Sequence, residues 1–107
     1  MNPNKLHLRT LVIGIPLALA SLAVSAQTPP PGRTLASQCA QCHGTNGNGP
    51  GFDEIAGKSA NELYSELQEM KARPVKDIMD RQARGYTDAQ LRLISEYLST
   101  LPGNGGD

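Results

Sequence analysis

The sequence predicts an all-α fold, a single small domain of three to four short helices. Two observations support this prediction. In two segments, apolar residues recur at spacings of three and four, and each segment opens with Ser or Thr followed three residues later by Glu or Gln, which is typical of a helix start. No segment alternates apolar and polar residues over a useful length, as a strand with one buried face would.

Residues 1–26 have the layout of a secretory signal peptide. Lys5 and Arg9 precede an apolar run, and Val24 and Ala26 are the small residues that an expected cleavage site requires. The uncharged stretch after Arg9 is also about as long as a membrane span, so a retained anchor is the alternative.

Cleavage after Ala26 would leave residues 27–107 as the mature chain, exported to an oxidising compartment, which we expect to be the periplasm. Two of the ten basic residues would leave with the signal peptide. Eight would then remain against ten acidic residues, which gives a net charge near −2. We expect no nucleic-acid partner and no membrane span after cleavage.

The first helix is expected directly after a Pro-rich linker. Residues 27–32 form this linker, which has no periodicity, and residues 33–43 fit a short helix. Residues 44–58 contain five glycines and are predicted to form a loop.

The second and third helices are expected on either side of Pro74. Ser59 and Glu62 form a capping-box sequence that opens the second helix, and its apolar stripe consists of Leu63, Leu67 and Met70. A short third helix is expected to end at Gly85, with apolar positions at Val75, Ile78, Met79 and Ala83.

The last helix is expected to open at Thr87, because Gln90 follows at capping-box spacing. Its apolar stripe consists of Leu91, Ile94, Leu98 and Leu101. Pro102 would stop the helix, so the domain is expected to span residues 33–102. Residues 103–107 are predicted to form a flexible tail.

The predicted core is thin for a stable domain. The chain contains one Phe, three Tyr and no Trp. Domains of this size usually need a disulfide, a metal or another group to hold them together. A disulfide between the only two cysteines, Cys39 and Cys42, would close a very short loop and would stabilise the fold little. A larger group is therefore expected.

The cysteines belong to the sequence Cys39-Ala40-Gln41-Cys42-His43, and four interpretations of it compete. A thioredoxin-type redox pair would need a βαβ context, a structural zinc site would need four ligands, and a plain disulfide leaves the histidine unexplained. The fourth interpretation is covalent haem c, for which C-x-x-C-H is the attachment pattern.

Helical geometry suits the haem interpretation. Residues three apart lie on one helix face, so both thiols can reach neighbouring vinyl groups of one haem. The next residue points about 100° further round the helix, which lets His43 reach the iron. We therefore expect one haem c per chain, bound through Cys39 and Cys42, with His43 as an axial ligand.

The second axial ligand is expected to be a methionine. His43 is the only histidine of the expected mature chain, which excludes a bis-histidine site within it. Met79 lies between Pro74 and Gly85 and could approach the iron from the side opposite His43. Met70 fits a core position better, although it, an open iron site and a lysine ligand stay as alternatives.

Residues 33–102 resemble the small bacterial class I cytochromes c, and within them most closely the cytochrome subunits of flavocytochrome c sulfide dehydrogenases. The resemblance lies in "CAQCHGTNGNGPG", "IAGK", "RPVKDIMDRQARGYTDAQL" and "ISEYLSTLP". It implies one cytochrome domain packed around the haem, Met79 as the second iron ligand, a Pro50 carbonyl that orients His43, and a flavoprotein dehydrogenase as partner. Those subunits often carry two haem-binding halves, whereas this chain has one motif.

Basic residues gather between the second and last helices, interleaved with Asp77 and Asp80. They are Lys71, Arg73, Lys76, Arg81 and Arg84. The cluster is either a solvated helix face or a charged surface that steers a redox partner.

The predicted function is single-electron transfer by a periplasmic cytochrome that is not an enzyme by itself. A cytochrome subunit of a flavoprotein dehydrogenase is the preferred form. A free carrier that serves a terminal oxidase is one alternative, and a haem enzyme or gas sensor with an open iron site is another.

Overall fold

The computed structural model describes residues 11–17, 20–21 and 23–104. In that part of the chain it contains helices and no β-strand, which confirms the predicted all-α class. The helical segments are α1 (Arg33–Ala36), the 3-10 turn η1 (Ser37–Cys39), α2 (Ala40–His43), the 3-10 turn η2 (Thr45–Gly47), α3 (Ala60–Ala72), α4 (Ile78–Arg84) and α5 (Asp88–Ser99). Segments α1, η1 and α2 follow one another directly and together form the helix predicted over 33–43.

The start of α3 lies where the sequence predicts it. Ser59 is the N-cap, and its hydroxyl accepts a hydrogen bond from the amide of Glu62 at 3.4 Å. The helix ends at Ala72, one residue before Arg73. This position agrees with the rule that the residue before a proline avoids helical geometry.

The predicted start of the third helix is wrong. Val75 lies in the non-helical segment between the helices, and α4 begins only at Ile78. Asp77 sets this start because its side chain accepts hydrogen bonds from the amides of Met79 and Asp80, at 2.9 and 3.3 Å. The Asp77 amide in turn donates to the Asp80 carboxylate, which completes the capping box. The two acidic residues together therefore fix the start of the helix.

The start of α5 confirms the predicted capping box. The Thr87 amide donates to the Gln90 side chain at 2.9 Å, and the Gln90 amide donates to the Thr87 hydroxyl at 3.2 Å. The helix ends at Ser99, so Leu101 is not part of it, contrary to the prediction. Leu101 nevertheless packs on the core from the turn that follows.

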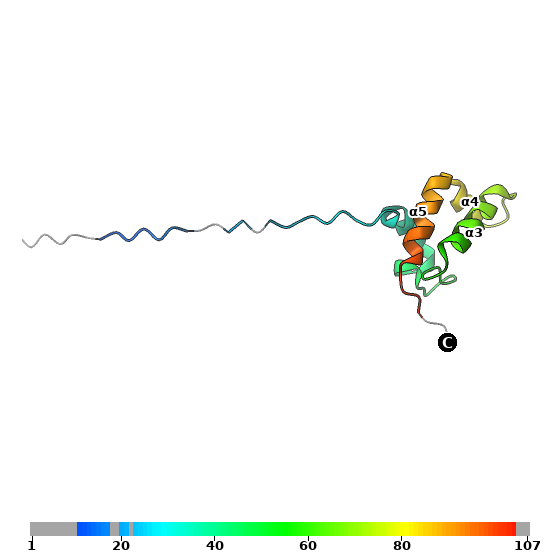
Figure 1. Ribbon diagram of the computed structural model, residues 1–107. Helices are drawn as coiled ribbons and strands as arrows, with labels where there is room; N and C mark the ends of the chain where they lie inside the picture. The colour runs from blue at the N-terminus through cyan, green and yellow to red at the C-terminus, as the bar shows by residue number, and fades with distance from the viewer. Residues whose placement is uncertain (1–10, 18–19, 22, 105–107) are drawn as a thin grey trace, which may run out of the picture.

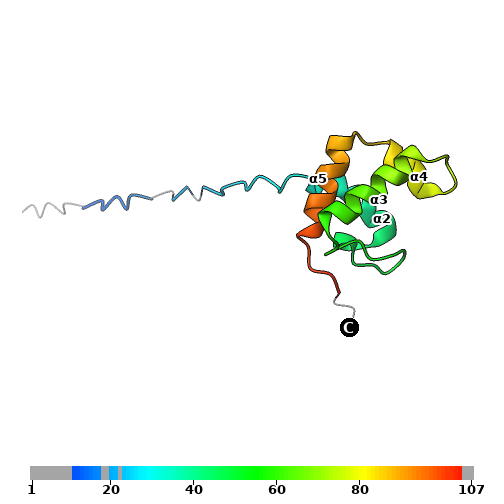
Figure 2. The ribbon, with the colours of Figure 1, turned by 45° about the vertical axis from the view of Figure 1, so that its right-hand side comes forward.

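Helix α3 lies between α4 and α5, and α1 packs against α5 (Figures 1 and 2). The core cluster is small and consists of Ala36, Leu63, Ile94 and Leu98. All four are buried, and seven partly buried apolar side chains surround them. The thin core expected from the composition is therefore present in the fold.

The described residues before Pro31 form no helix and run away from the helical domain (Figure 1). Their apolar side chains are exposed, for example Leu11 at 81% and Val24 at 88%. No described helix is long and apolar enough to cross a membrane. Lys5 and Arg9 lie outside the described residues, and signal cleavage stays a prediction.

The other end of the chain returns to the loop that follows α2. The Asn104 amide donates to Glu54, and the Asn104 side chain donates to the carbonyl of Asn48 at 2.6 Å. Residues 105–107 of the expected tail lie outside the described residues.

Candidate functional site

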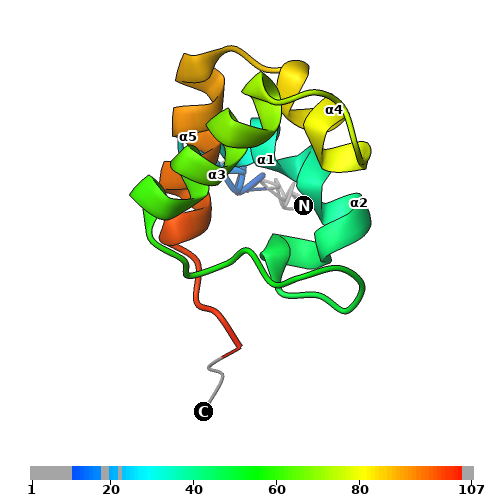
Figure 3. The ribbon, with the colours of Figure 1, turned by 90° about the vertical axis from the view of Figure 1, so that its right-hand side faces the viewer.

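A cavity of about 530 Å³ lies within the helical domain. Its walls come from residues 38–43, from the loop residues 52–58, and from α3, α4 and α5, the helices shown in Figure 3. The volume lies in the usual range of cofactor sites, about 300–1,000 Å³. Two apolar stripes supply much of the wall: Leu63, Leu67 and Met70 from α3, and Leu91, Ile94 and Leu98 from α5.

Both cysteines line this cavity, and they form no disulfide with each other. Cys39 ends η1 and is half-buried, whereas Cys42 lies in α2 and is exposed. Burial raises the pKa of the Cys39 thiol. Burial also raises the pKa of Tyr86, which lines the same cavity, and the nearby charge of Cys39 adds to this shift.

His43 lines the cavity at the end of α2, and its tautomer follows from one contact. Nδ1 lies 2.6 Å from the carbonyl oxygen of Asp53. A carbonyl only accepts, so Nδ1 must carry the proton and donate it. In the neutral ring the other nitrogen, Nε2, therefore carries the lone pair that can ligate a metal, and the carbonyl both orients the ring and makes it more basic.

The expected role of the Pro50 carbonyl is therefore taken by Asp53. The loop folds back onto the end of α2, because the Gly49 amide donates to the His43 carbonyl at 2.6 Å and the Phe52 amide donates to the Cys42 carbonyl at 3.0 Å. The residue after Phe52 then lies at the imidazole, whereas Pro50 is exposed in the loop.

Both candidate methionines line the cavity. Met79 lies on α4, one residue after the start of that helix. Met70 lies on α3 in line with Leu63 and Leu67 and lines the cavity. It is not among the residues of the core cluster or those packed against it, so the core position expected from its stripe is not found. The spacing correctly identified a shared helix face, but spacing does not say what that face covers.

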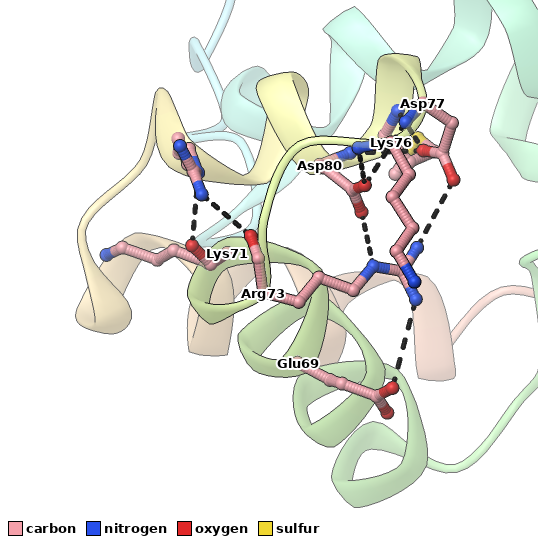
Figure 4. A network of polar contacts seen from close by, with 8 residues as sticks. Glu69, Lys71, Arg73, Lys76, Asp77 and Asp80 are labelled. Carbon is pink, nitrogen blue, oxygen red and sulfur yellow. Dashed lines mark hydrogen bonds and ion pairs between the residues drawn. The ribbon is translucent and has the colours of Figure 1, made fainter.

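Asp80 is buried, although its place among the basic residues of the sequence indicated no such role. Its side chain is fully buried and accepts three hydrogen bonds (Figure 4). The Lys76 amide, followed by the Arg73 guanidinium, holds the pKa of the Asp80 carboxyl below its usual range. Arg73 in turn has a raised pKa because it donates to Asp80.

The basic cluster is neither a simple solvated face nor a free charged surface. Arg73 binds Asp80, and Lys71 donates to the Tyr86 carbonyl and to Asp88, each at 2.8 Å. Arg84 donates to the carbonyls at the C-terminal end of α3. Three of the five basic residues therefore connect helices, and Lys76 and Arg81 are exposed.

The cavity suits a large apolar group that contains a metal. The cavity would offer this group one metal-ligating imidazole, from His43, and two thiols, from Cys39 and Cys42. Among the described residues, no three His, Cys, Asp or Glu side chains gather as ligands of a bare metal ion.

Comparison with known proteins identifies the family of the chain and, with it, the group that the cavity holds. Residues 30–102 match the family model described as cytochrome c. The chain belongs to the cytochrome c family. It is also 37% identical over 84 residues to the cytochrome subunit of sulfide dehydrogenase from Chlorobaculum tepidum, a match that covers 77% of this chain and 76% of that protein.

Membership of the cytochrome c family explains the cavity. The protein binds one haem c covalently and transfers electrons, and Cys39 and Cys42 have the spacing of the C-x-x-C-H motif. The cavity fits this cofactor in three respects: its volume, its apolar walls on α3 and α5, and the free Nε2 of His43.

Proposed function

We propose that this cytochrome is the periplasmic electron acceptor, and a subunit, of a flavoprotein dehydrogenase of the sulfide dehydrogenase type. The observation that carries the proposal is the 37% identity to such a cytochrome subunit across most of both chains. The signal-like segment of residues 1–26 supports export.

In this proposal Cys39 and Cys42 would hold the haem through thioether bonds, and His43 and Met79 would ligate its iron. When bound, the haem supplies a one-electron change between Fe(III) and Fe(II). The protein excludes water with the apolar faces of α3 and α5 and fixes the His43 ring through the Asp53 carbonyl.

Met79 is preferred to Met70 because of where each residue lies. Met70 continues the straight apolar wall of Leu63 and Leu67 on α3. Met79 lies on a short separate helix, whose start is held by hydrogen bonds of its own. A thioether ligand would raise the reduction potential, and an iron ligated by both residues would leave no position for small molecules, which suits electron transfer.

Matched methionine variants test the ligand assignment. Met79→Ala should abolish the weak sulfur-to-iron charge-transfer band of the ferric protein, lower its potential and let the reduced protein bind carbon monoxide. Met70→Ala should keep the band and cost about 1–2 kcal/mol, less than a fully buried methionine, because Met70 is half-buried. A band that survives in Met79→Ala and disappears in Met70→Ala would reverse the assignment.

Purification from the native host tests the partner. A flavoprotein should remain bound to the cytochrome at low salt, and the N-terminus of the cytochrome should be Gln27. A monomeric cytochrome that retains no flavoprotein would instead favour the free carrier, a form that agrees with the single haem motif.

A further inference from the structure

The Asp80 carboxylate joins the end of α3 to the start of α4 (Figure 4). One of its oxygens accepts from Arg73 Nε at 2.7 Å. The other accepts from the amides of Lys76 and Asp77, at 2.8 and 3.2 Å. Since the side chain is fully buried, these three donors replace the water that would otherwise solvate it.

The same network continues to the backbone of Met79. Asp77, whose amide Asp80 holds, accepts a hydrogen bond from the Met79 amide at 2.9 Å. Arg73 also contacts Asp77, with Nη2 at 3.2 Å from the second carboxylate oxygen. Arg73 therefore binds both acidic residues of the capping box, and the box holds the backbone of Met79.

Helix α4 depends on these polar contacts for its position. It has seven residues, and an isolated helix of that length is unstable in water. Its buried side chains are Asp80 and Ala83, so apolar packing holds it only weakly. At its other end, Arg84 Nη2 donates to the Arg73 carbonyl at 2.7 Å.

We propose that Asp80, together with Arg73, is a positioning residue that keeps the Met79 thioether on the haem iron. The inference rests on the proposed function, in which Met79 is the second axial ligand. If the network is weakened, α4 moves more freely and the sulfur leaves the iron for a larger fraction of the time. That fraction governs how tightly an added ligand binds and contributes to the reduction potential.

The test measures imidazole binding to the ferric, haem-loaded full chain. Asp80→Asn has the same shape but loses its charge and places an amide donor against existing donors. It should bind imidazole about tenfold more tightly than the wild type, as expected for a tenfold larger open fraction. Its charge-transfer band should weaken and its potential should fall, while the helical circular dichroism persists.

Three further variants separate positioning from stability. Thr87→Ala removes the N-cap of another helix, outside the network and the cavity, and should stay within about twofold of the wild type in imidazole affinity. Leu101→Ala removes a core contact outside the cavity, so it should lower the thermal stability and leave the affinity unchanged. Arg73→Lys loses the forked guanidinium and should tighten imidazole binding. If Asp80→Asn does not fold, this variant decides whether the network positions Met79.

The outcomes separate this proposal from the ligand assignment. A band that survives Met79→Ala overturns both. A band lost in Met79→Ala, combined with wild-type imidazole affinity in Asp80→Asn or, if that does not fold, in Arg73→Lys, overturns the positioning role alone.

Discussion

Replacing Gly51 with alanine should disturb His43 without touching it. Gly51 has φ +136°, a backbone conformation that side chains rarely adopt. A Cβ at this position would lie 2.6 Å from the carbonyl oxygen of Cys42. That oxygen accepts the hydrogen bond from the Phe52 amide, so the loop must move away from α2.

The cost combines backbone strain with a weakened hydrogen bond. A residue in such a conformation costs about 1–3 kcal/mol, and a lost hydrogen bond about 0.5–1.5 kcal/mol. We therefore expect Gly51→Ala to lower the free energy of unfolding by about 2–4 kcal/mol. Gly49→Ala is the matched control, since φ is +69° there but, apart from the two adjacent residues, the nearest atom to an added Cβ lies 3.9 Å away. It should cost only the strain, about 1–2 kcal/mol.

Denaturant unfolding of the haem-loaded protein, followed by circular dichroism, measures both variants. The potential gives a second reading, because under the proposed ligand assignment displacement of the Asp53 carbonyl would make His43 a less basic ligand and raise the potential. Equal unfolding free energies for Gly51→Ala and Gly49→Ala would refute the predicted clash. A destabilised Gly51→Ala with an unchanged potential would show that the loop does not control the imidazole.

Two further predictions concern the start of α5 and the haem attachment. Thr87→Ala removes the N-cap hydroxyl and should cost about 1 kcal/mol in denaturant unfolding, with an unchanged haem spectrum. The double variant Cys39→Ala/Cys42→Ala should lose covalent haem and much of its helical circular dichroism, and the wild-type mass should exceed that of the apo chain by one haem. Wild-type haem that extracts into acid acetone would contradict covalent attachment.

Local chemistry explains which helix starts could be predicted. Ser59 and Thr87 each act on an amide three residues away, so the sequence alone contains both partners. Apolar spacing predicts the third helix but wrongly includes Val75 in it. An acidic pair at capping distance, Asp77 and Asp80, was the signal that could have corrected its start.

The same distinction between local and distant contacts explains why the sequence predicts the haem motif but not the hydrogen-bond partner of its histidine. The spacing of Cys39, Cys42 and His43 is local, and covalent attachment requires it. The carbonyl that orients His43 comes from Asp53, ten residues further along the chain. Which carbonyl reaches the ring depends on how the loop between them folds, and hydrogen bonds from the Gly49 and Phe52 amides determine this. No residue type marks a carbonyl acceptor, since every residue has one.

The apolar stripes of α3 and α5 have two roles, and this connects stability to electron transfer. Leu63, Ile94 and Leu98 belong to the core cluster and also line the cavity. Haem placed in the cavity therefore extends the same apolar interior. It adds the buried apolar surface that a small chain without Trp lacks. A substitution at these three positions must change both the unfolding free energy and the surroundings of the haem, whereas a change at Thr87 alters stability alone.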